Sequence, residues 1–110
     1  MNFTILDKEE QLSEIKAEEN YSIIFKHNTT CPISKGVKRS LEEDGDKFPS
    51  EVPVYILDLL SHRNISDAIA EDFHVKHESP QLLIIKNGKC SYHESLHNIT
   101  VEETIKAMKN

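Results

Sequence analysis

The sequence lacks several features that would place it in common functional classes. Two cysteines among 110 residues are too few for a disulfide framework. No apolar stretch reaches membrane-spanning length, and residues 1–7 show no basic region followed by an apolar core. We therefore expect a cytoplasmic protein without a membrane segment. Basic residues are also scarce, because 13 Lys and Arg face 19 Asp and Glu, for a net charge of -6. This balance argues against binding to nucleic acid or anionic membranes.

The chain is short, and no repeat or low-complexity linker divides it. A length of 110 residues fits one hydrophobic core and leaves no room for a second. We therefore expect residues 1–110 to form a single domain, and we expect a monomer.

The hydrophobic pattern predicts strands that alternate with helices. Strands are expected at residues 3–6, 21–26, 52–58, 81–86 and 89–92, with Asn87-Gly88 as the turn of a closing hairpin. Helices are expected after Asp7, over residues 32–44 and 65–73, and after Thr100; the expected caps are Asp7 with Glu10, Asn64, and Thr100 with Glu103. The order strand-helix-strand-helix-strand-helix-strand-strand-helix indicates an α/β fold with a mixed sheet of four to five strands.

Cys31 lies where a predicted strand passes into a predicted helix. Pro32 suits the first helical position because it has no N–H to leave unpaired. The unpaired N–H groups of the first turn carry partial positive charge and favour a thiolate over a thiol. Since the thiolate is the nucleophilic form, the sequence predicts that Cys31 is catalytic.

The motif that begins at Cys31 contains one thiol and not two. Ser34 occupies the position of a second, resolving cysteine in a Cys-x-x-Cys motif, and a hydroxyl cannot form a disulfide. Ser34 could instead donate a hydrogen bond to the sulfur. Thiol–disulfide exchange at Cys31 is therefore expected to stop at a mixed disulfide until another thiol arrives.

Together with the order of elements, two signals resemble the thioredoxin-like superfamily. They are the Cys31-Pro32-Ile33-Ser34 helix start and the Ser79-Pro80 step before the hairpin. The resemblance implies a cis bond at Pro80 that exposes the Ser79 backbone to an extended thiol substrate. It also implies that Pro80 lies next to Cys31. Cys90, which lies opposite residues about five positions beyond Pro80, would then be more than ~15 Å from Cys31 at ~3.3 Å per strand residue. One departure is Phe25, which stands where dithiol thioredoxins have a buried acidic residue.

Three runs make the resemblance more specific. Residues 30–34, 76–81 and 98–100 are similar to the YtxJ family of monothiol bacilliredoxins. This implies removal of bacillithiol from mixed disulfides on cytoplasmic proteins, with free bacillithiol as co-substrate and no tightly bound cofactor. The site residues so implied are catalytic Cys31 and substrate-binding Thr30, Pro32, Ile33, Ser34, Ser79 and Pro80.

Two other classes of function stay open from the residues alone. One is a redox-inactive adaptor that uses the Pro80 region to hold a protein partner. The other is a metal or cluster carrier with Cys31 as a ligand. The Cys90-x-x-His93-x-x-x-His97 spacing has some character of a metal site, but Cys90 and His93 would face opposite sides of a strand, and we expect no metal.

Overall fold

The computed structural model describes residues 1–109. Its strands are β1 (Thr4–Ile5), β2 (Ser22–His27), β3 (Val54–Asp58), β4 (Gln81–Lys86) and β5 (Lys89–Ser95). Its helices are α1 (Glu9–Ala17), α2 (Pro32–Asp44), α3 (Arg63–Asp72) and α4 (Val101–Lys109), with short 3-10 turns η1 (Gly45–Lys47) and η2 (Leu96–Asn98). None of the helices in this range is long and apolar enough to cross a membrane.

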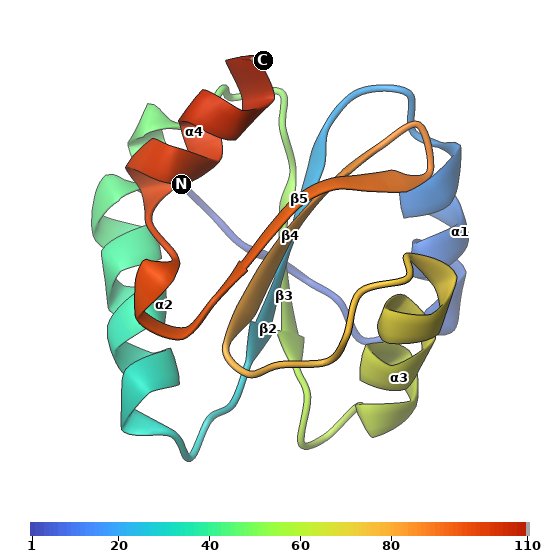
Figure 1. Ribbon diagram of the computed structural model, residues 1–110, viewed down its shortest axis with the longest axis horizontal. Coiled ribbons are helices and arrows are strands. Elements are labelled where there is room, and N and C mark those ends of the chain that lie inside the picture. The colour runs from blue at the N-terminus through green and yellow to red at the C-terminus, as the bar shows by residue number, and fades with distance from the viewer. Residues whose placement is uncertain (110) are drawn as a thin grey trace.

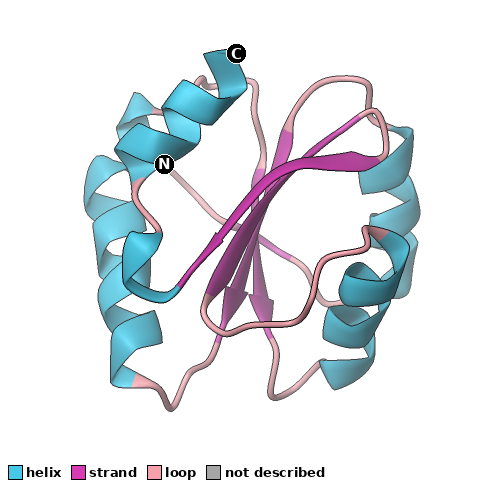
Figure 2. Ribbon diagram, viewed as in Figure 1, coloured by secondary structure: helices cyan, strands magenta, loops and turns pink. Residues whose placement is uncertain are grey.

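The strands form one mixed sheet in the order β1-β3-β2-β4-β5. The first three of these are parallel, whereas β4 runs antiparallel to β2 and pairs with β5 as a hairpin. Helices α1 and α3 cover one face of the sheet, and α2 and α4 cover the other (Figures 1 and 2). This arrangement confirms the predicted thioredoxin-like α/β class with its mixed sheet.

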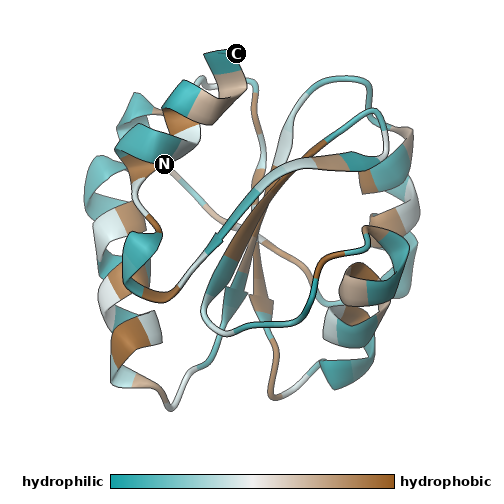
Figure 3. Ribbon diagram, viewed as in Figure 1, coloured by the Kyte–Doolittle hydropathy of each residue, from teal (hydrophilic) through white to brown (hydrophobic). Residues whose placement is uncertain are grey.

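The core consists of two hydrophobic clusters separated by the sheet. One contains Ile24 and Leu83 and packs under α1 and α3, while the other contains Phe25 and Leu82 and packs under α2 and α4. Neighbouring residues of one strand thus serve opposite faces, as the two-residue period of a strand requires. Hydrophobic positions accordingly concentrate on the central strands and on the sheet-facing sides of the helices (Figure 3).

Most predicted elements are present, but several boundaries differ. Helix α1 is preceded by Lys8, and Gln11 rather than Glu10 caps it, because its Oε1 accepts the backbone N–H groups of Asp7 and Lys8 at 2.9 Å each. Helix α3 begins at Arg63, so Asn64 is already helical and is not the cap.

The end of the chain follows the prediction more closely. Asn87 and Gly88 have φ values of 53° and 75°, which confirms the tight turn of the hairpin. Strand β5 then extends three residues further than predicted, to Ser95. Thr100 Oγ1 accepts the N–H of Glu103 at 3.1 Å, which confirms the predicted cap of α4.

Candidate active site

Cys31 is the residue immediately before helix α2. Its backbone is extended (φ -96°, ψ 121°), its carbonyl accepts the first helical N–H from Lys35 at 3.0 Å, and Pro32 opens the helix. The side chain is partly exposed and forms no disulfide. The geometry therefore presents a reachable thiol at the positive end of a thirteen-residue helix.

The loop between β2 and α2 is shaped by a turn centred on Asn28. Asn28 Oδ1 accepts the backbone N–H of Thr30 at 3.0 Å and its hydroxyl at 2.8 Å, and the Asn28 carbonyl accepts the N–H of Cys31 at 3.1 Å. An asparagine that accepts two residues ahead reverses the chain locally. Thr30 is exposed beside Cys31, with its hydroxyl proton engaged in this turn.

Ser34 ties the end of β2 to the first turn of α2. It is fully buried, and its Oγ accepts the N–H of Asn28 at 2.9 Å and lies 2.6 Å from His27 Nδ1. The described residues show no hydrogen bond between Ser34 and the Cys31 sulfur. The expected contact of Ser34 with sulfur stays a prediction, while its contribution to the shape of the loop is visible.

His27 is the buried partner in that contact. Its ring stacks on Phe25 with centroids 5.5 Å apart. Burial, reinforced by the Lys38 ammonium and opposed by the Asp58 carboxylate, lowers the pKa of His27. The imidazole is therefore neutral at neutral pH, and one tautomer lets Nδ1 accept the Ser34 hydroxyl proton.

The Ser79–Pro80 step lies at the same end of the central strands as Cys31. Strands β2 and β4 are antiparallel neighbours with Lys26 opposite Gln81, so the segment before β4 comes beside the end of β2, below the sheet in Figure 1. The peptide bond between Ser79 and Pro80 is cis, as the resemblance implied. The Pro80 carbonyl accepts the N–H of Leu96 at 3.0 Å, which fastens this segment to the end of β5.

Ser79 itself has few partners. Its Oγ is shielded from solvent without a hydrogen bond. Its backbone N–H and C=O also make no hydrogen bond within residues 1–109. A backbone in this state can pair with an extended substrate as a neighbouring strand would.

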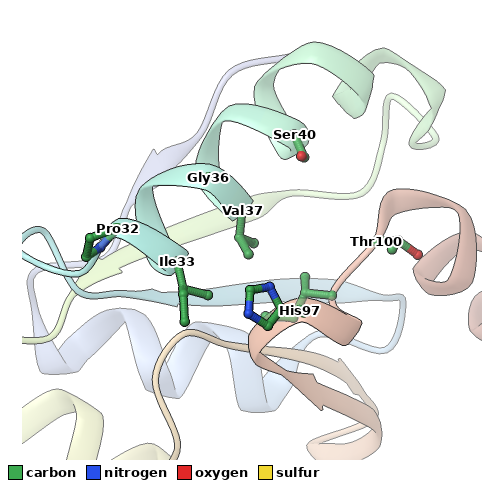
Figure 4. A pocket seen from close by; sticks show the side chains of 8 residues that line it. Pro32, Ile33, Gly36, Val37, Ser40, His97 and Thr100 are labelled. Carbon is green, nitrogen blue, oxygen red and sulfur yellow. The ribbon is translucent and has the colours of Figure 1, made fainter.

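A shallow groove of about 480 Å³ runs beside the first turns of α2 (Figure 4). It is bordered by α2 on one side and by the segment from η2 to α4 on the other. The lining residues are Pro32, Ile33, Gly36, Val37, Ser40, His97, Ile99 and Thr100. The structure thus brings Pro32 and Ile33, two of the predicted substrate-binding residues, to the rim of a depression that starts next to Cys31.

Lys26 and its partners are the feature that sequence reasoning missed. The side chain is fully buried on the face opposite Phe25, and its Nζ donates to the Ser66 carbonyl at 3.1 Å and lies 3.3 Å from His77 Nδ1. Ser66 Oγ also lies 3.3 Å from that nitrogen. Burial lowers the pKa of Lys26 from the ordinary 10.5 to about 8, against the opposing effect of Asp67. The available signal was a lysine that directly follows the apolar residues 23–25 of β2.

Cys90 lies at the other end of the hairpin from Pro80. It pairs with Ile85 next to the turn, is half-buried, and donates its S–H to the Tyr92 carbonyl at 3.2 Å. Burial raises the pKa of the Cys90 thiol. Within residues 1–109, no three His, Cys, Asp or Glu side chains lie close enough together to hold a metal ion.

Comparisons with known proteins agree with this geometry. A family model described as "Monothiol bacilliredoxin BrxC" matches residues 4–104. Among solved structures, a putative oxidoreductase with a thioredoxin fold is similar over 94% of this chain and 90% of its own, with 29% identity and a TM-score of 0.82.

Thioredoxins themselves are more distant. The thioredoxin of Trypanosoma brucei brucei has 18% identity and a TM-score of 0.75 over 98% of this chain and 88% of its own. The thioredoxin of Malassezia sympodialis has 16% identity and the same TM-score, over 98% of this chain and 89% of its own. Likeness at this level shows the fold alone.

Proposed function

Because the chain belongs to the monothiol bacilliredoxin BrxC family, we propose that it removes bacillithiol from protein mixed disulfides. Membership and the thioredoxin fold support a redox role in general. The observation that carries the specific proposal is the position of Cys31: a partly exposed thiol at a helix start, with buried Ser34 in the position of a resolving cysteine.

The reaction proceeds by one exchange at Cys31. The Cys31 thiolate attacks the bacillithiol sulfur of the mixed disulfide, a new S–S bond forms between them, and the old S–S bond breaks. The electron pair of that bond leaves with the client sulfur, which takes a proton from water. Cys31 then carries bacillithiol, and a second bacillithiol thiolate removes it as the symmetrical disulfide and restores the Cys31 thiolate.

This scheme names the partners and the roles of the site. The co-substrates are bacillithiolated cytoplasmic proteins and free bacillithiol. The Ser79 backbone beside Pro80 receives the extended client chain, and Thr30, Pro32, Ile33 and Ser34 surround the reacting sulfur. The neutral His27–Ser34 pair supports this arrangement because it fixes the loop that carries Cys31.

The test is a pair of cysteine variants assayed on a peptide that carries bacillithiol on its single cysteine. We expect Cys31→Ser to reduce release of the peptide thiol to the uncatalysed rate. Cys90→Ser should leave the rate within about twofold of wild type, because Cys90 is at the far end of the hairpin and contacts neither Cys31 nor the Ser79–Pro80 segment. Full activity of Cys31→Ser would rule the scheme out, whereas a wild-type protein that releases no peptide thiol would favour the redox-inactive adaptor.

A further inference from the structure

We propose that Lys26, Ser66 and His77 form a buried clamp that positions the Ser79–Pro80 segment for exchange at Cys31. They are positioning residues, because they act on the substrate through the backbone of that segment. The inference rests on the proposed function. It assigns a positioning role in that function to three residues on the face of the sheet opposite Phe25.

The clamp depends on Lys26, whose charge is buried at a cost in free energy. Lys26 has no exposed surface, and fully buried lysines are rare unless their charge is paired. Its Nζ has a carbonyl and an imidazole nitrogen as hydrogen-bond partners. Against the larger effect of burial, the Asp67 carboxylate on α3 acts on the ammonium by electrostatic attraction, which raises the pKa of Lys26. A methionine of similar length would fill the same space in β2 without the cost of burying a charge. An apolar side chain could thus fill this position, and the buried amine points to a role beyond packing.

The amine and its strand neighbour hold consecutive residues of one segment. Gln81, directly opposite Lys26 across the β2–β4 pair, donates from Nε2 to the Lys76 carbonyl at 3.0 Å. Lys26 Nζ reaches the next residue, His77, at 3.3 Å. Two buried side chains thus fix the stretch that leads directly into Ser79 and Pro80.

The clamp needs His77 in its neutral form, because Nδ1 must accept a hydrogen bond from the ammonium. The charged groups around His77 are Lys26 on β2, Arg63 and Asp67 on α3, and Glu78 beside it. Burial, reinforced by Lys26 and then Arg63, lowers the pKa of His77. At neutral pH the ring therefore accepts from Lys26, and Ser66 Oγ provides a further contact from α3.

Loss of the clamp should weaken substrate binding without changing the reactivity of the Cys31 sulfur. An extended client chain pairs with the Ser79 backbone, so a loosened segment should weaken that pairing. A small alkylating reagent reaches Cys31 without using the segment. Loss of the clamp is therefore expected to raise KM for a peptide substrate while the reaction of Cys31 with iodoacetamide stays unchanged.

The experiment compares Lys26→Met with Lys89→Met, a matched change at an exposed lysine on β5. With the bacillithiol-carrying peptide, we expect KM to rise about tenfold for Lys26→Met, the scale of one lost charge-assisted hydrogen bond. The iodoacetamide rate at Cys31 should match wild type, and Lys89→Met should match wild type in both assays.

A second pair of variants keeps the inference testable if Lys26→Met does not fold. His77→Asn retains an acceptor near the position of Nδ1, whereas His77→Leu removes it. We expect the asparagine variant to recover most of the wild-type KM and the leucine variant to resemble Lys26→Met.

The outcomes separate this inference from the proposed function. Wild-type KM in a folded Lys26→Met, or equal KM for the two His77 variants, would overturn the clamp while Cys31→Ser remained inactive. An equal loss in the peptide and iodoacetamide assays would also overturn it, because that pattern indicates a general disturbance of the site.

Discussion

Because of Lys26, the free energy of unfolding should vary with pH in the alkaline range. Burial lowers the pKa of Lys26 to about 8 in the folded chain, while an unfolded lysine titrates at 10.5. Between these values the unfolded state binds a proton that the folded state has released. The free energy of unfolding therefore increases as pH rises through this window, and the penalty for the buried charge is complete below it.

We predict that this dependence disappears in Lys26→Met. Between pH 8 and pH 10.5, wild type should gain about 3 kcal/mol of unfolding free energy relative to the variant, at about 1.4 kcal/mol per unit of pKa shift. Urea unfolding at several pH values measures the difference, and tyrosines and Cys90 cancel because both proteins contain them. Parallel pH profiles for the two proteins would contradict the prediction.

The junction of β2 and α2 depends on one buried hydroxyl. Ser34 receives the N–H of Asn28 and pairs with His27 Nδ1, so the end of a strand and the start of a helix share one oxygen. These hydrogen bonds explain how the four residues between β2 and α2 can turn the chain and place Cys31 at the start of the helix. The same serine that prevents an internal disulfide also holds the loop in shape.

We predict that Ser34→Ala destabilises the fold by about 1–3 kcal/mol, because it leaves a partly buried N–H and a buried ring nitrogen without their partner. The matched control is Ser40→Ala on the exposed side of the same helix, with an expected change within about 0.5 kcal/mol. Denaturant unfolding compares the two. Equal stabilities would show that the hydroxyl contributes nothing to the junction.

The molecule as a whole keeps its two thiols apart. Cys31 follows the C-terminal end of β2, and Cys90 lies at the opposite end of the strands, next to the turn of the β4–β5 hairpin. A disulfide requires Cα atoms within about 7 Å. Ile85, which lies opposite Cys90, is four positions along β4 from Gln81, or about 13 Å at ~3.3 Å per strand residue. The fold therefore supports a reaction that uses one cysteine at a time.

We predict a single product when the protein is treated with oxidised bacillithiol. Peptide mass spectrometry should locate one bacillithiol on Cys31 and none on Cys90, since burial raises the pKa of the Cys90 thiol. An intramolecular link between the two cysteines in the native monomer would contradict both the sheet geometry and the one-thiol mechanism.

The sequence allowed prediction of features that depend on near neighbours. Pro32 after Cys31, Asn87-Gly88 and the Thr100 cap act within a few residues, and the structure confirms all three. The misplaced caps of α1 and α3 show the limit of such signals: several polar residues near each helix start compete, and packing selects among them.

The buried lysine could not be predicted in this way. A lysine at the end of an apolar run usually reaches solvent, and its partner His77 is 51 residues away. Whether that lysine points into the core depends on strand register and on the placement of α3. Which helices cover each face of β2 likewise depends on the tertiary structure, because the order of strands in the sheet places them.

The amino-acid sequence by itself determined that Cys31 stands at a helix start and that no cysteine occupies the position of a resolving thiol, because both are properties of one short segment. Only the tertiary structure decided which backbone lies beside that thiol and what fixes it there. The physical reason is that strand pairing joins residues far apart in the chain, and burial then makes every polar group between them find a partner.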